Sequence, residues 1–211
     1  MLTCDSFIYF KRVALTEKAR TDKPLVVDIL ELIKQRRTIQ TFLSDDISEA
    51  LIHEAIEAAI YAPNHKLTWP WHFVWVEKAT REKLAALQVE LKARKSGGQL
   101  SKVEHDAIVK KFMEAPILLI ASIKKSANPS QSEEDYASMA CAIQNMALYL
   151  WAEKIGLKWG TGALINESRT LDILGLNERE LKICGLIWIG KARSVPPEPK
   201  RPPASQFLIR K

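Results

Sequence analysis

The stretch APNHKLTWPWHFV, residues 62–74, joins a helical pattern to an apolar strand pattern. It combines two prolines, two tryptophans, two histidines, one lysine and one asparagine. A connection that only had to turn the chain would use Gly, Asn, Asp or Ser. The bulky, cationic and hydrogen-bonding side chains of this stretch therefore favour contact with a flat, polar-edged, anionic ligand.

Hydrophobic periodicity on both sides of this stretch predicts helices that alternate with strands. A helix is expected from residue 25 to about 37, and a second helix follows Ser48, which is a suitable N-cap. Residues 73–76 form a short buried strand pattern. Further helices are expected at about 80–95, in the segment ending near 114, at about 136–155 and at 171–174, and further strands at 117–121, 157–159 and 183–189.

The segment from Tyr136 to about Ile155 is the longest predicted helix, and Gly156 is its expected C-cap. This helix is apolar almost all round, which is typical of a central helix. Helices that surround strands far apart in sequence indicate a layered α+β or α/β structure, here in one domain.

The chain has 211 residues, 47% hydrophobic and 27% charged, which is ordinary for a soluble globular protein. Its three cysteines, Cys4, Cys141 and Cys184, are widely spaced and fit neither a disulfide framework nor a metal site, so a reducing compartment is expected. Cys141 and Cys184 lie in apolar runs and are expected in the core. Because secretory and membrane-spanning patterns are also absent, we expect a cytoplasmic protein without membrane contact.

The formal net charge is +6, and residues 191–211 carry most of the excess together with five of the ten prolines. The basic residues thus lie on an extended arm and not on one face of a helix. Such an arm could be a solvated tail, a nucleic-acid contact or a strap around a partner subunit. Motifs for P-loop, hydrolase or zinc chemistry are absent, and no metal site is expected.

Five segments, in this order, resemble the FMN-dependent nitroreductase family, specifically its short single-domain branch. They are Arg36–Thr38, Ala62–Lys66, Trp69–Phe73, Trp159–Leu164 and Gly185–Lys191. The resemblance covers about residues 25–203, and it leaves residues 1–24 as an N-terminal extension and residues 204–211 as a C-terminal tail. It implies an α-β-α layered α+β fold with a mixed, mainly antiparallel sheet, and an intertwined homodimer with the flavin at the interface.

The resemblance assigns Arg36, Arg37 and Thr38 to the FMN phosphate, with Arg201 of the tail as a further contact. Guanidinium groups match phosphate geometry. From the residues alone, Arg36 and Arg37 could instead complement the C-terminus of the first helix.

For the flavin ring, the resemblance implies contacts from His65, supplied by the neighbouring subunit, and from the backbone of Trp159, Gly160, Thr161 and Gly162. Glycine permits close backbone approach, although these residues could also form an ordinary turn after a strand. Trp69 stands where the family usually has Gln, and an indole offers one donor and no acceptor. Stacking or simple packing could replace the amide contact.

The implied activity is hydride transfer from NADH or NADPH to FMN, followed by reduction of a small electron-poor acceptor such as a nitroaromatic or a quinone. With one pocket serving both ligands in turn, ping-pong kinetics are expected, and no side chain is expected to act as catalytic acid or nucleophile. Two alternatives remain. One is a flavin-binding protein of the same fold with different or lost redox chemistry, and the other is a basic nucleic-acid-binding module.

Overall fold

The computed structural model describes residues 28–211, so the predicted extension 1–24 and residues 25–27 of the predicted first helix lie outside the described residues. The helices are α1 (Ile29–Gln35), α2 (Glu49–Ile60), α3 (Lys78–Lys95), α4 (Lys102–Glu114), α5 (Pro129–Ala152) and α6 (Ser168–Leu174). The strands are β1 (Trp71–Trp75), β2 (Ile117–Lys124), β3 (Gly156–Gly160) and β4 (Leu181–Gly190). Three short 3-10 turns are η1 (His65–Leu67), η2 (Ala163–Asn166) and η3 (Ala204–Gln206).

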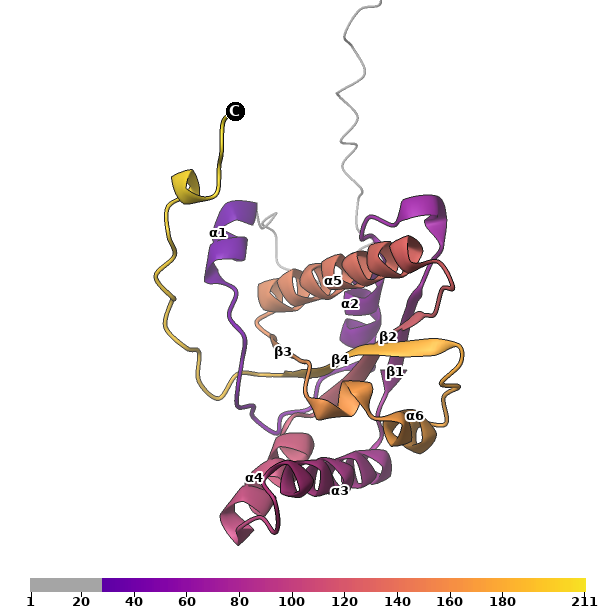
Figure 1. Cartoon of the computed structure of the whole chain (residues 1–211). Helices are drawn as coiled ribbons and strands as arrows, with labels where there is room; N and C mark the ends of the chain where they lie inside the picture. The colour runs from indigo at the N-terminus through magenta and orange to yellow at the C-terminus, as the bar shows by residue number, and fades with distance from the viewer. Residues whose placement is uncertain (1–27) are drawn as a thin grey trace, which may run out of the picture.

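The four strands form one antiparallel sheet in the order β1-β2-β4-β3. Helices α2 and α5 pack on one face, and α3, α4 and α6 cover the other face (Figure 1). This arrangement confirms the predicted layered α+β fold. Within residues 28–211, parallel pairing occurs only at the isolated bridge between Thr38 and Leu157.

Side-chain caps explain where the helices begin. The Ser48 hydroxyl accepts a hydrogen bond from the Leu51 N–H, as the predicted N-cap requires. The prediction for α5 was wrong at both ends. Asn128 caps this helix and Pro129 occupies its first turn, so α5 begins well before residue 136. It ends at Ala152, because the chain already turns at Lys154, whose φ is 62°.

Gly156 is therefore not the C-cap of α5, and it is the first residue of β3. A Cβ atom at this position would lie 2.4 Å from Cγ1 of Ile39. Glycine is needed here because the chain before β3 approaches the 38–39 segment very closely.

Strand β4 contains a bulge opposite β2. The pairing register with β2 shifts between Ala121 and Ser122, which leaves Cys184 as the extra residue. Cys184 is buried as predicted, and burial raises the pKa of its thiol to about 11. The prediction for Cys141 was wrong: this thiol is exposed, since it lies on the uncovered side of α5.

Gly185, next to the bulge, leaves room for the Trp159 indole. A Cβ atom there would lie 2.1 Å from Trp159 Nε1 and 3.2 Å from the Gly160 carbonyl oxygen. We expect Gly185→Ala to lower the free energy of unfolding by about 2 kcal/mol, because the indole must leave its place in a packed core. Gly98→Ala is the matched control, since a Cβ atom at Gly98 meets nothing within 4 Å. Equal urea midpoints for the two variants would contradict this account of the packing.

A buried guanidinium fastens the start of α3 to the sheet. Arg81 is 7% exposed and donates three hydrogen bonds to carbonyl oxygens, at 2.8 Å to Val76, 2.7 Å to Ala115 and 2.8 Å to Pro116. Burial lowers the pKa of Arg81. These three bonds join the residue after β1 to the two residues before β2.

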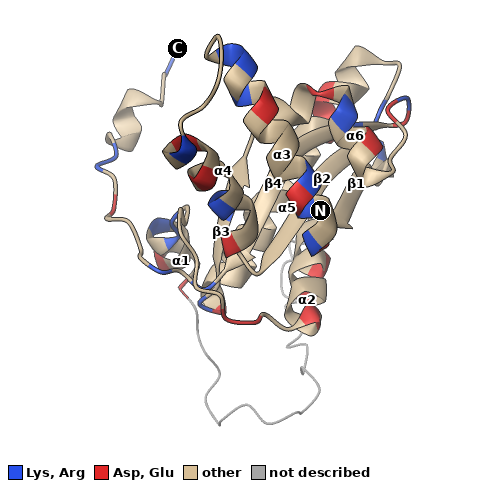
Figure 2. Ribbon diagram, turned by 90° about the horizontal axis from the view of Figure 1, so that it is seen from below, with Lys and Arg blue, Asp and Glu red and all other residues tan. Residues whose placement is uncertain are grey.

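Two surface features complete the fold. Positive and negative side chains both occur on α1, α3, α4 and α6, as Figure 2 shows, so the basic residues of the described chain are not gathered on one helix. None of the helices within residues 28–211 has the length and apolar character needed to cross a bilayer.

Candidate functional site

Arg36 is the best placed of the predicted phosphate-binding residues. It follows the last turn of α1 and is half-buried, and its Nε atom is buried without a hydrogen-bond partner in the described structure. Burial lowers the pKa of Arg36, and the nearby positive charges of Arg201 and Arg37 lower it further. An arginine held in this way lacks an acceptor and a counter-charge, and a phosphate group would supply both.

Arg37 is engaged with the protein itself. Its Nη1 donates to the carbonyl oxygens of Lys34 and Arg36, the latter at 3.0 Å, and its Nη2 lies 3.6 Å from the Glu198 carboxylate. Arg37 therefore caps the end of α1 and holds the C-terminal arm against it, as the helix-capping alternative anticipates. Its contact with phosphate stays a prediction.

The arm brings Arg201 to the same place. In Figure 1 the C-terminal segment, drawn in yellow, runs from the end of β4 around the outside of α1. The charge of Arg201 lowers the pKa of Arg36, so these two residues lie near each other although they are far apart in sequence.

Strand β3 lies directly beside this arginine group. The Ile39 N–H donates to the Leu157 carbonyl at 3.2 Å, and Thr38 forms a parallel bridge with Leu157. The strand continues to Gly160, after which Thr161 and Gly162 are exposed. Two predicted segments thus lie along β3: Arg36–Thr38 pairs with Leu157 near its beginning, and Gly160–Gly162 follows at its end. Together with Arg201 we call them the β3-edge cluster.

The two glycines of this cluster have different reasons to be glycine. A Cβ atom at Gly160 would lie 2.7 Å from the Trp188 ring, so protein packing already demands glycine there. At Gly162 the nearest atom would be Gln88 Oε1 at 3.9 Å, and φ is −77°, which any residue adopts. The protein itself does not require glycine at 162, and the open space beside it suits the close approach of a flat ligand.

The Trp159 side chain points away from this open space. Its Nε1 donates to the Cys184 carbonyl at 3.2 Å, and its ring packs against the core on the α2 and α5 side. Any contact of Trp159 with a ligand therefore comes from its backbone, which is how the prediction has it.

His65 and Trp69 lie in a second region, which we call the aromatic loop (residues 62–72). Lys66, Leu67 and Trp69 have φ values of 57°, 51° and 46°, a conformation that side chains other than glycine rarely adopt. The Asn64 side chain stabilises this conformation by accepting a hydrogen bond of 2.8 Å from the Trp69 N–H. Backbone strain of this kind is concentrated at functional sites.

A buried carboxylate fastens the aromatic loop to the beginning of α5. Asp135, 3% exposed, accepts the Thr68 hydroxyl at 2.6 Å and the Gln131 amide at 3.0 Å. Ser138 donates to the Pro63 carbonyl at 2.8 Å. These anchors leave His65 exposed and Trp69 55% exposed, with the Trp69 ring 5.9 Å from that of Trp71.

Within one chain the aromatic loop and the β3-edge cluster lie at opposite ends of α5 (Figure 1). The loop is bonded near Ser138, whereas Leu32 of α1 lines a cavity with Trp151 at the other end of the helix. The helix rises about 20 Å between Ser138 and Trp151. One protomer therefore does not bring His65 and Trp69 to Arg36.

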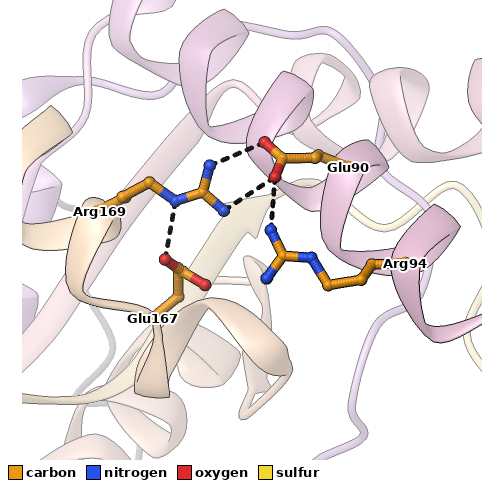
Figure 3. Close-up of polar contacts among 4 residues, drawn as sticks. All are labelled: Glu90, Arg94, Glu167 and Arg169. Atoms are coloured by element: carbon orange, nitrogen blue, oxygen red, sulfur yellow. Dashed lines mark hydrogen bonds and ion pairs between the residues drawn. The ribbon is translucent and has the colours of Figure 1, made fainter.

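A network of ion pairs positions the segment that follows Gly162 (Figure 3). Arg169 donates to both oxygens of Glu90 at 2.8 and 3.1 Å and to Glu167 at 2.8 Å, and Glu90 also accepts from Arg94 at 2.7 Å. The hydrogen bonds from Glu90 and Glu167 raise the pKa of Arg169. The spacing of Glu90 and Arg94 is visible in the sequence, but the link from α3 to α6 appears only in the fold.

The comparisons with known proteins point in one direction. The model of the Nitroreductase family matches residues 33–191. YfhC of Bacillus subtilis, named as a candidate NAD(P)H nitroreductase, is 26% identical over 173 residues, which are 82% of this chain and 89% of that protein. A nitroreductase-like protein from Bacillus cereus superposes with a TM-score of 0.77 at 24% identity, covering 90% of this chain and 98% of that chain.

A second solved structure contains a cofactor. It is a candidate nitroreductase from Desulfovibrio desulfuricans in complex with FMN, with a TM-score of 0.68 and 23% identity, covering 88% of this chain and 97% of that chain. At these identities the two solved structures establish a shared fold.

Proposed function

Because this chain belongs to the nitroreductase family, we propose that it is an FMN-dependent oxidoreductase, which takes hydride from NADH or NADPH and reduces a small electron-poor acceptor such as a nitroaromatic or a quinone. The single observation that carries this proposal is the Arg36 guanidinium, whose buried Nε lacks a partner in the described structure. Its segment pairs through Thr38 with strand β3, which leads to the open space at Gly162. The FMN complex of a protein with the same fold and the name of YfhC support it.

In this proposal the residues of the β3-edge cluster hold the cofactor. Arg36 and Arg201 bind the phosphate, with Arg37 and the Thr38 hydroxyl as further contacts. Backbone N–H groups from Gly160 to Gly162 face the ring, and the missing Cβ atom at Gly162 lets the ring come close. When bound, FMN supplies the hydride-transfer chemistry, so no side chain has to act as acid or nucleophile.

We further propose that the active form is a homodimer and that each site takes residues from both copies. The α1 face with Ile29, Leu30 and Ile33, which are 70%, 58% and 47% exposed, has no buried residue. Apolar residues of the arm, Phe207 and Ile209, are also exposed. A second copy that covers these surfaces would resemble an obligate interface, and its aromatic loop could complete the site.

Mixed dimers test the shared site. We expect a dimer with Arg36→Gln in one chain and His65→Ala in the other to keep one site of normal FMN affinity. If each site came from one protomer, both sites would be defective. The homodimeric variants are the controls, and the measurement is FMN titration of differently tagged chains that are purified together. A monomeric protein in sedimentation experiments would contradict the proposal at once.

Turnover separates the leading proposal from an altered flavoprotein. The observation that favours the alternative of changed or lost redox chemistry concerns Trp69. Its side chain is exposed and its backbone is strained, at a position where the family usually has the amide of Gln. FMN-loaded protein should oxidise NADH or NADPH when a nitrofuran or a quinone is present, with parallel lines in double-reciprocal plots. Intersecting lines would exclude the ping-pong scheme, and a yellow protein without turnover would support the alternative.

The remaining expectations follow from the same proposal. The mixed surface charge favours an oxidoreductase over a nucleic-acid-binding module, which would gather basic and aromatic side chains on one surface. A cytoplasmic location, where NAD(P)H is available, stays a prediction.

A further inference from the structure

Two lysines share one aromatic ring beside the β3-edge cluster. Lys158 of β3 places its Nζ 5.9 Å from the centre of the Trp188 ring, and Lys111 of α4 places its Nζ 4.7 Å from the same point. Trp188 itself is 3% exposed. The ring attracts each cation, but two like charges around one ring also repel each other.

Neither ammonium group is compensated by an acidic side chain. Burial lowers the pKa of Lys158, and burial together with the charge of Lys158 lowers the pKa of Lys111. No carboxylate of the described residues raises either pKa. The one hydrogen bond described for Lys158 Nζ goes to the neutral side-chain oxygen of Gln40. An anionic group at this place would remove the imbalance.

The position of Lys158 connects it to the candidate site. Gln40 lies two residues after Thr38, and Lys158 lies two residues before Gly160. The Lys158–Gln40 hydrogen bond and the Thr38–Leu157 bridge thus join the two segments that form the β3-edge cluster. Lys158 therefore lies between the arginine end of the cluster and its glycine end.

We propose, on the basis of the function proposed above, that Lys158 is a further cofactor-binding residue, which neutralises the carbonyl-rich edge of the flavin ring with support from Lys111. Hydride transfer from NAD(P)H brings two electrons and one hydrogen to the ring, and NAD(P)+ leaves. The reduced ring is then an anion unless it takes a proton from solvent. A fixed ammonium group at its edge favours the reduced state.

A phosphate is the other source of negative charge for this lysine. The arginine end of the cluster already provides for the FMN phosphate, since Arg36 has a free buried donor and Arg201 beside it. Lys158 lies one residue past Leu157, the partner of Thr38, toward the glycine end of β3, which the ring is proposed to occupy. The ring edge is therefore the favoured partner, and comparison of FMN with riboflavin separates the two sources.

The test is the midpoint potential of bound FMN in Lys158→Gln. We expect this variant to bind reduced FMN at least tenfold more weakly relative to oxidised FMN, which lowers the potential by about 30 mV or more. Lys158→Arg keeps the charge and should stay near the wild-type potential, and Lys111→Gln should show a smaller decrease. Lys110→Gln, which changes an exposed neighbour on α4, is the matched control and should have no effect.

Three results are distinguishable. An unchanged potential in Lys158→Gln, with FMN still bound, would overturn this inference and leave the proposed function intact. A loss of affinity for FMN but not for riboflavin would assign Lys158 to a phosphate and would also overturn it. A wild-type protein that binds no FMN would instead defeat the proposed function.

Discussion

Replacing Arg36 by glutamine should weaken FMN binding by about 10- to 100-fold while leaving the affinity for riboflavin nearly unchanged. The reason is that the Arg36 side chain has a buried donor without a partner in the described structure and stands beside Arg201. A hydrogen bond to a charged group contributes about 1.5–3 kcal/mol, and each 1.4 kcal/mol corresponds to about tenfold in affinity. Riboflavin lacks the phosphate and so reports only on the ring contacts.

The same variant should not lose stability in the absence of ligand. Burial and the neighbouring Arg201 both lower the pKa of Arg36, which means that the fold disfavours its charge. Removing that charge therefore should not lower the free energy of unfolding. Binding residues often reduce stability in this way. Arg179→Gln, an exposed arginine, is the control for general charge effects. Flavin fluorescence gives the affinities and urea denaturation gives the stability. Equal losses for FMN and riboflavin would contradict a phosphate contact.

Replacing Arg81 by methionine should lower the free energy of unfolding by about 3–5 kcal/mol, as is typical when one side of a buried charged contact is removed. The substitution keeps much of the side-chain volume but leaves the carbonyl groups of Val76, Ala115 and Pro116 without their donor. Buried carbonyl groups without partners are costly. We expect the variant to fold at low temperature and to have its unfolding midpoint at a much lower urea concentration than the wild type.

Lys83→Met on the same helix is the matched control, since Lys83 is exposed and its loss should change stability by less than about 0.5 kcal/mol. The FMN stoichiometry of folded Arg81→Met should equal that of the wild type, because the hydrogen bonds of Arg81 go to Val76, Ala115 and Pro116 and not to the β3-edge cluster. Such measurements are accurate to about 1 kcal/mol. A free energy of unfolding that differs from the wild type by less than this would show that the three hydrogen bonds do not fasten β1 and β2 together.

The local signals in the sequence predicted most of the elements correctly. Ser48 before a helical stripe, the apolar run at 117–121 and the run at 183–189 each predicted an element that the structure contains. These signals succeed because capping and hydrophobic periodicity act over a few residues. The family resemblance, carried by segments in a fixed order, is confirmed by the family match over residues 33–191.

Contacts between distant segments could not be predicted in this way. Gly156 looks like a helix C-cap, but its neighbour Ile39, far away in sequence, decides its role. Arg81 looks like one of many surface charges on a charged helix, and only the folded chain brings three carbonyl groups to it. A charged residue such as Lys158 within a short apolar strand is visible in the sequence, but its hydrogen bond to Gln40 is not.

In the candidate site, too, local motifs were visible in the sequence and contacts between distant residues were not. The motif predicted Arg36 as a phosphate-binding residue, and that role stays a prediction. The capping role of Arg37 and the inward orientation of Trp159 follow from contacts that the sequence does not display. The separation of the aromatic loop from the β3-edge cluster also depends on the length and direction of α5. It is the reason why the proposed site needs a second copy of the chain.

The binding of FMN is the central claim, and an absorption spectrum tests it most directly. The protein is purified, incubated with FMN, passed through a desalting column and scanned in the visible range. The account predicts flavin bands that correspond to about one FMN for each chain, because FMN is the proposed cofactor. Protein that remains colourless after this treatment, while folded, would contradict it.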